Sequence, residues 1–116
     1  MTGALLAAAA ASAKGGTDTV VLDVGDVIGI TGAFVITSGS NPRLVKAIAE
    51  EVEAKLKVEP GISPIRIEGA GGAEWILMDY GDFVVHVFGE ETRGFFQLEH
   101  LWADVPRLAW EPVVLA

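Results

Sequence analysis

Short apolar runs rich in β-branched residues recur along the chain and predict the strands of a sheet. The run TVVLDV at residues 19–24 is typical of a central strand, and AFVIT at residues 33–37 predicts a second strand. A third strand is expected at residues 65–68. Two further runs, at residues 75–78 and 83–88, flank the sequence Asp-Tyr-Gly-Asp and predict a β-hairpin. The pattern therefore predicts five strands, of which the last two pair antiparallel.

One long segment after the second predicted strand has apolar residues at helical spacing. Pro42 suits the first helical position, with Asn41 or Ser40 as the N-cap residue, and the helix is expected to run to about Lys57. The charged residues on its other side, including the i,i+4 pair Glu53 and Lys57, are expected to face solvent. The residues expected to pack on the sheet form one stripe: Leu44, Val45, Ile48, Ala49, Val52 and Leu56.

The alanine-rich segment at residues 1–15 predicts a short first helix. Alanine is the best helix former, and Gly15 and Gly16 would end a helix cleanly. A secretory signal needs a basic residue before its apolar stretch, and none is present. The stretch is also too short to cross a bilayer, which takes about 20 apolar residues. We therefore expect a short first helix, or a flexible end.

The segment after Gly89 predicts one or two short helices. Gly89 would end the last strand, and the acidic pair that follows suits a helix start. Leu98, Leu101 and Trp102 are expected to anchor this segment to the sheet. Residues 105–116 contain two prolines and are expected to be irregular.

These elements predict a single domain of the α/β class. We expect a mixed five-stranded sheet sandwiched by helices, formed mainly by residues 19–104. Residues 1–15 would add a helix or a flexible end, and residues 105–116 a C-terminal extension. A chain of 116 residues is long enough to bury one hydrophobic core.

The predicted hairpin is apolar on both of its faces, which is unusual for an antiparallel pair. Its turn is expected to have Tyr80 and Gly81 as the two central residues, so that Trp75 lies opposite His86. Side chains alternate across a strand. One face would then hold Ile76, Met78, Phe83, Val85 and Val87, and the other Trp75, Leu77, Val84, His86 and Phe88. Either the hairpin is buried on both sides, or one face binds a partner.

Composition and charge exclude several classes of function. The chain has no cysteine, which excludes disulfides, thiol catalysis and cysteine-ligated metal sites. Its formal net charge is −8, and residues 68–104 contain eight acidic residues and one basic residue, Arg93. Nucleic-acid binding relies on basic residues, so little or no direct binding to RNA or DNA is expected. The acidic surface either only keeps the protein soluble or steers it toward a basic protein.

Support for an enzyme is weak. The two histidines, His86 and His100, lie in no recognisable nucleophile motif, and His86 is more readily explained as structural or interfacial. The glycines at residues 69–72 suit ordinary turns, and the Walker pattern with its lysine is missing. Asp79 and Asp82 flank a turn and form no obvious pair for magnesium. A nucleotide-binding or nucleotidyltransferase-like enzyme is therefore the alternative, and we expect no metal or cofactor.

Three blocks of sequence resemble the ribosomal silencing factor (Iojap-like) family. They are WxLMDYGD at residues 75–82, VHxF at residues 85–88 and LExLW at residues 98–102, and they occur in the order and at the spacing of that family. The resemblance covers roughly residues 19–104. Any one block alone would be unspecific, whereas the three together are specific.

The resemblance implies a non-enzymatic, cytoplasmic repressor of translation. Proteins of this family bind the large ribosomal subunit through its fourteenth protein, on the subunit-joining side. They thereby block association with the small subunit and reduce translation when nutrients are scarce, as in stationary phase. Their fold is similar to that of nucleotidyltransferases without the catalytic carboxylates. We expect no membrane association and a monomer or weak homodimer.

The hairpin is the expected partner-binding surface. In this hypothesis an apolar patch is rimmed by acidic residues and a tyrosine, and the acids pair with a basic ribosomal protein. The alternative is that the tryptophan and the last phenylalanine are core residues beneath a helix. The residues expected to bind the partner are Trp75, Leu77, Met78, Asp79, Tyr80, Asp82, His86 and Phe88.

One position departs from the family pattern. The family usually has Asp in a Thr-Asp-x-Phe sequence before its second strand, and this chain has Gly32 in Thr31-Gly32-Ala33-Phe34. If the aspartate contacts the partner, this protein has lost that contact. If it caps a turn, glycine replaces it at little cost.

Overall fold

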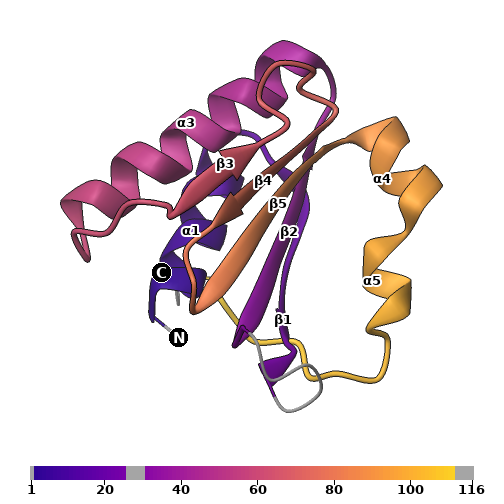
Figure 1. The fold of residues 1–116 in the computed structure, drawn as a ribbon. Helices are drawn as coiled ribbons and strands as arrows, with labels where there is room; N and C mark the ends of the chain where they lie inside the picture. Colours follow the sequence, from indigo (N-terminus) through magenta and orange to yellow (C-terminus); the bar gives the residue numbers. More distant parts are fainter. Residues whose placement is uncertain (1, 26–30, 112–116) are drawn as a thin grey trace, which may run out of the picture.

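The computed structural model describes residues 2–25 and 31–111 and contains a mixed five-stranded sheet (Figure 1). The strand order is β1-β2-β5-β4-β3. The central pair β2 and β5 is parallel, and the other three pairs are antiparallel. The strands are β1 (Thr17–Asp23), β2 (Ala33–Gly39), β3 (Arg66–Glu68), β4 (Trp75–Asp79) and β5 (Phe83–Gly89). The predicted mixed sheet and all five predicted strands are confirmed.

Helices lie on both faces of the sheet (Figure 1). One face packs against α1 (Thr2–Ala13) and α3 (Pro42–Val58) and forms the larger core cluster. We call this the inner face. Beside the other face lie two short helices, α4 (Glu90–Phe96) and α5 (Leu98–Leu101), over a smaller cluster. Among the described residues, no helix is both long and apolar enough to cross a membrane.

Helix α3 begins as its sequence predicts. Pro42 occupies the first turn, and the Asn41 side chain accepts a hydrogen bond of 2.9 Å from the backbone N–H of Leu44. The predicted stripe packs on the sheet, with Leu44 partly buried. Glu51 pairs with Lys55 at 3.9 Å, on a solvated side where the pair adds little stability. The predicted pair of Glu53 with Lys57 was wrong, since these two described residues form no ion pair.

The alanine-rich segment is a packed helix. Its buried residues are Ala4, Ala7, Ala8, Ala10 and Ala11. Their small side chains let α1 lie close to α3 and to the sheet. Gly15 ends the helix with a φ of +105°. Next to it, a Cβ on Gly16 would lie only 2.4 Å from Thr37 Oγ1 and 2.8 Å from the carbonyl oxygen of Ala11.

The hairpin has a different register from the predicted one. The backbone N–H of Tyr80 donates to the carbonyl of Phe83 at 3.0 Å, so the central turn residues are Gly81 and Asp82. Trp75 consequently lies opposite Phe88, not His86. The turn moves by one residue because the Asp79 carboxylate accepts a hydrogen bond of 2.8 Å from the N–H of Gly81, which has a φ of +85°. The shift preserves the alternation, so the two predicted faces are unchanged.

The C-terminal extension lies along the free side of β1. Leu22 forms an isolated antiparallel bridge with Arg107, and the Trp110 Nε1–H donates to the carbonyl of Thr19 at 3.0 Å. The segment is otherwise irregular, as predicted, up to residue 111. The predicted contribution of Pro112 lies outside the described residues.

Candidate functional site

The sheet face turned away from α1 and α3 is the candidate site, and we call it the outer face. The strand registers place its side chains in rows across β2, β5 and β4. One row is Phe34, Val84 and Asp79, and the next is Ile36, His86 and Leu77. Trp75 and Phe88 form the last row. The outer face therefore brings together apolar and aromatic side chains that are separated by up to 54 positions in the sequence.

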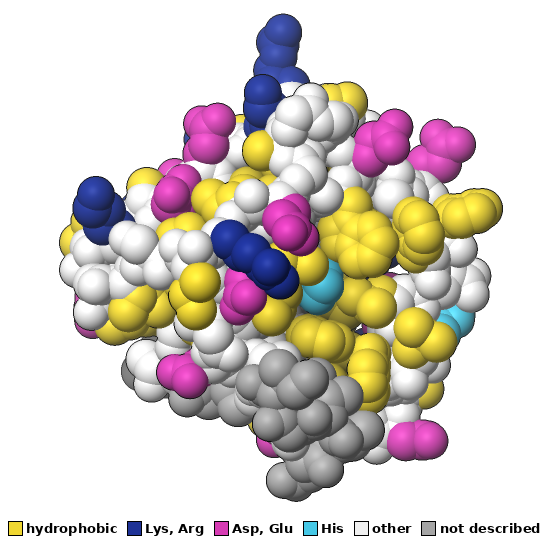
Figure 2. All heavy atoms as spheres, in the orientation of Figure 1, with side chains coloured by type: hydrophobic (Ala, Val, Ile, Leu, Met, Phe, Trp, Pro, Cys, Tyr) yellow, Lys and Arg dark blue, Asp and Glu magenta, His cyan; other side chains and the backbone are white. Residues whose placement is uncertain are grey.

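The outer face has a buried floor and an open top. Phe88 and His86 are buried, whereas Phe34, Trp75 and Leu77 are only half-buried. Leu98 and Trp102 cover the part nearest β1 and pack against Leu22, Ile36 and Phe88. Figure 2 shows hydrophobic side chains gathered in one area between the hairpin and the two short helices, with charged side chains at its border.

Trp75 is held in place by three ring contacts. Its Nε1–H donates a hydrogen bond of 3.0 Å to Nδ1 of His86. Its ring stacks on Phe88 with centroids 4.8 Å apart and meets Phe96 of α4 at 5.0 Å. The orientation of the indole is therefore fixed before any partner binds.

His86 is neutral at physiological pH. Burial lowers its pKa from 6.5 to about 4. Because Nδ1 accepts the bond from Trp75, the ring proton lies on Nε2, which is buried and has no hydrogen-bond partner among the described residues. The Phe34 ring meets the His86 ring edge to face at a centroid distance of 5.0 Å.

Acidic side chains border the outer face. Asp79 ends its row and lies 3.7 Å from the guanidinium of Arg66 on β3, which also lies 3.9 Å from Glu68. All of these groups are at least partly exposed, so the pairs are weak. Further exposed acids near the hairpin and the short helices are Glu74, Asp82, Glu90, Glu91 and Asp104.

Two of the expected partner-binding residues do not lie on the outer face. Met78 lies on the inner face and is fully buried, because it alternates with Leu77 and Asp79 along β4. Tyr80 is not at the rim. It stacks on Phe83 at 4.8 Å on the inner side, where burial and then the nearby Glu53 carboxylate raise the pKa of Tyr80 to about 12.

The other six expected residues lie on or beside the outer face. Trp75, Leu77, His86 and Phe88 belong to it, although Phe88 is fully buried within its floor. Asp79 is at its border, and Asp82 is exposed in the hairpin turn beyond it.

Sequence analysis missed the contribution of the short helices. Leu101 was expected to anchor its helix, but it is 73% exposed. Helix α5 is a single turn that ends at Leu101 and is too short for a continuous buried stripe. Of the three expected anchors, Leu98 and Trp102 pack on the sheet and Leu101 does not. Phe95 and Phe96 are also exposed, at 81% and 50%. Their apolar character in an acidic segment is the signal that could have identified them.

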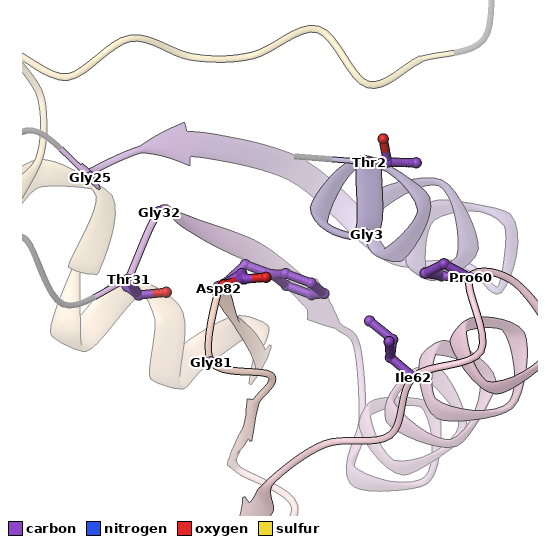
Figure 3. A pocket seen from close by; sticks show the side chains of 10 residues that line it. Thr2, Gly3, Gly25, Thr31, Gly32, Pro60, Ile62, Gly81 and Asp82 are labelled. Atoms are coloured by element: carbon purple, nitrogen blue, oxygen red, sulfur yellow. The ribbon is translucent and has the colours of Figure 1, made fainter.

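A cavity of about 610 Å³ lies away from the outer face, between the start of α1 and the hairpin turn (Figure 3). Thr31 and Asp82 lie on one side of it and Pro60 and Ile62 on the other. Among the described residues that line it, Asp82 is the single carboxylate and there is no basic side chain. Nor do the described residues elsewhere bring three metal-ligating side chains together. The described lining thus supplies neither a carboxylate pair for magnesium nor a basic side chain for phosphate, as the nucleotidyltransferase-like alternative would require.

Comparison with known proteins identifies the family. The family model described as "Ribosomal silencing factor during starvation" matches residues 2–115. The chain is 38% identical over 109 residues to ribosomal silencing factor RsfS of Halalkalibacterium halodurans, covering 94% of this chain and 92% of that one. It is 39% identical over 101 residues to RsfS of Bacillus subtilis, covering 87% of this chain and 85% of the relative.

A solved structure shares the fold. The crystal structure of a protein from Chromobacterium violaceum is similar with a TM-score of 0.80 and 36% identity, over 84% of this chain and 81% of that chain. The family model and the relatives together span almost the whole chain, including α1 and the hairpin. The chain therefore belongs to the ribosomal silencing factor family.

Proposed function

We propose that this protein binds the large ribosomal subunit through its fourteenth protein and blocks joining of the small subunit. Translation would thereby be repressed in the cytoplasm when nutrients are limiting. The relatives named above are ribosomal silencing factors, which supports a ribosomal partner. The identity of the subunit protein and the steric block are the proposal.

The partly open outer face is the observation that carries this proposal. Leu77 and Trp75 are half-buried in the isolated chain, and the adjoining Phe96 is 50% exposed. An apolar area with a fixed aromatic ring inside a polar border is the usual anatomy of a protein–protein hot spot. A partner that covers this area removes apolar surface from water at roughly 25 cal/mol per Å².

The charge of the border supports a basic partner. Asp79 lies at the border of the outer face beside Arg66, and further exposed acids lie near the hairpin and the short helices. The chain as a whole has a net charge of −8. Positive charge on the partner would raise the association rate of the two proteins and orient them toward each other. It would also disfavour binding to bare RNA, which repels an acidic surface.

Obstruction of subunit joining needs no chemistry. The chain has a radius of gyration of 13.0 Å and extents of 34 × 31 × 31 Å. A rigid body of this size on the joining side would keep the two subunits apart. The protein therefore acts by occupancy and not as an enzyme.

Cosedimentation with purified large subunits tests the proposal. Leu77→Ser shortens a half-buried side chain on the outer face, and we expect it to weaken binding about tenfold or more. Val58→Ser is the matched control, because Val58 is 86% exposed at the end of α3, on the helix layer of the inner face. Circular dichroism should show that both variants are folded.

A gradient assay of subunit joining completes the test. Wild-type protein should lower the fraction of joined ribosomes, Val58→Ser should do so equally, and Leu77→Ser should require a higher concentration. Equal binding of Leu77→Ser and wild type, or binding of wild type to large subunits that lack the fourteenth protein, would refute the proposed contact.

A further inference from the structure

Arg93 is the one basic residue in the acidic segment 68–104, and it is buried. Its guanidinium donates to the carbonyl oxygens of Thr17 and Asp18 at 3.1 and 2.7 Å. It also donates to Ser38 Oγ at 3.1 Å and to Glu99 Oε1 at 3.0 Å. Four acceptors thus satisfy a side chain that would otherwise be costly to bury.

These bonds join parts of the chain that are distant in sequence. Thr17 and Asp18 belong to β1, Ser38 to β2 and Glu99 to α5, while Arg93 itself lies in α4. Burial acts to raise the pKa of the Glu99 carboxyl, but its backbone hydrogen bond and Arg93 outweigh this effect and keep the pKa below its ordinary value. Glu99 is therefore ionised at neutral pH, and the pair with Arg93 is a charge-assisted hydrogen bond.

The two short helices need the hydrogen bonds of Arg93 to hold them against the sheet. Helix α4 has seven residues and α5 has four, far too few for independent stability in water. Leu98 and Trp102 pack against the sheet at one end. The Arg93 bonds, together with the bond of 3.1 Å from Thr17 Oγ1 to the Glu90 carboxylate, fix the other end.

The helices expose three large apolar side chains, which we call the α4–α5 ridge: Phe95, Phe96 and Leu101. Phe95 and Phe96 meet edge to face at 5.1 Å, and Phe96 meets Trp75 at 5.0 Å. The two phenylalanines of the ridge are therefore continuous with the outer face. Glu90 and Glu91 are exposed and lie on α4 with the two phenylalanines, and their negative charge suits a basic partner.

We propose that the α4–α5 ridge is a second part of the docking surface and that Arg93 is a positioning residue that holds it in the binding arrangement. This inference rests on the proposed function, and its occupant is the same basic ribosomal protein that covers the outer face. Arg93 touches no partner. It acts by keeping Phe95 and Leu101 on rigid helices, so that docking does not have to order them.

A double-mutant cycle on cosedimentation with large subunits tests this inference. Leu101→Ser should weaken binding of the wild-type chain about tenfold. In an Arg93→Met background, where the ridge is no longer held, the same change should cost less than about twofold. Leu77→Ser on the sheet should cost the same in both backgrounds, which separates loss of the ridge from a general loss of stability.

Two further variants keep the test decisive. Arg43→Met removes a charge from an exposed residue of α3 and should leave the cost of Leu101→Ser unchanged. Glu99→Gln weakens the Arg93 network with a smaller change and replaces Arg93→Met if that variant does not fold. Amide hydrogen exchange should be faster at residues 90–101 in the Arg93→Met or Glu99→Gln chain, with β5 unchanged.

The outcomes separate the inference from the proposed function. Wild-type protein that does not cosediment overturns both. If wild type binds and Leu77→Ser weakens binding, but Leu101→Ser costs nothing or costs equally in both backgrounds, only the ridge and the role of Arg93 are overturned.

Discussion

Acidification should destabilise this protein through His86. In the fold its Nδ1 must accept a hydrogen bond from Trp75, and burial lowers its pKa from 6.5 to about 4. Protonation would put a charge in the floor of the outer face and turn the acceptor nitrogen into a donor. The folded chain therefore resists protonation of this ring, whereas the unfolded chain takes up the proton near pH 6.5.

The sign and size of the effect follow from proton linkage. Between pH 6.5 and pH 4 the unfolded state binds more protons, so the free energy of unfolding falls as the pH falls through this window. The full difference corresponds to ~3 kcal/mol, because one pKa unit is worth about 1.4 kcal/mol. From pH 7 to pH 5 the expected loss is ~2 kcal/mol. The depressed pKa of Glu99 adds its own loss only at lower pH.

Urea unfolding at pH 7, 6 and 5 measures this loss. His86→Asn does not titrate in this range and should have a much flatter dependence on pH, whatever its stability at pH 7. His100→Asn is the matched control, since His100 is exposed on α5, and it should keep the wild-type dependence. The reasoning is refuted if the free energy of unfolding of His86→Asn falls as much between pH 7 and pH 5 as that of wild type. The ¹⁵N chemical shifts of the His86 ring should show an unprotonated Nδ1 at pH 6.

Three other outcomes are expected. Gly16→Ala should lower the free energy of unfolding by about 2 kcal/mol, because the new Cβ would overlap Thr37 and the Ala11 carbonyl. Gly72→Ala is the control: its Cβ would meet nothing within 4 Å, and the free energy of unfolding should change by less than about 0.5 kcal/mol. Raising the salt concentration from 0.1 to 0.5 M should weaken cosedimentation with large subunits several-fold if the acidic border steers docking, and an unchanged affinity would contradict that role. Sedimentation equilibrium should show a monomer or a weak dimer, and Leu77→Ser should weaken any dimer; a dimer that survives this change would use a different surface.

The elements could be predicted because their signals are local. The strands follow from β-branched runs, and α3 follows from Pro42, its Asn41 cap and one apolar stripe. The two faces of the hairpin also follow from sequence, since alternation does not depend on the exact turn. The turn itself was predicted one residue too early, because the bond between Asp79 and Gly81 is a choice among several that the sequence DYGD allows.

The long-range parts of the site could not be predicted. Arg93 is separated by 76 positions from Thr17, and nothing in a local pattern shows which carbonyls will surround it. The same limit explains Leu101, whose spacing from Leu98 suggested a buried stripe although α5 ends after one turn. Tyr80 looked like a rim residue because the expected turn placed it at the tip of the hairpin, whereas it pairs with Phe83 and faces inward.

The central claim is that the partly open outer face meets the ribosome, and not the layer of helices α1 and α3 that covers the inner face. Hydroxyl-radical footprinting of the chain with and without large subunits, read by mass spectrometry, tests this most directly. The account predicts that oxidation of Trp75 and Leu77 falls strongly in the complex while oxidation of Val58 on α3 is unchanged. Protection of Val58 with unchanged oxidation of Trp75 and Leu77 would contradict it.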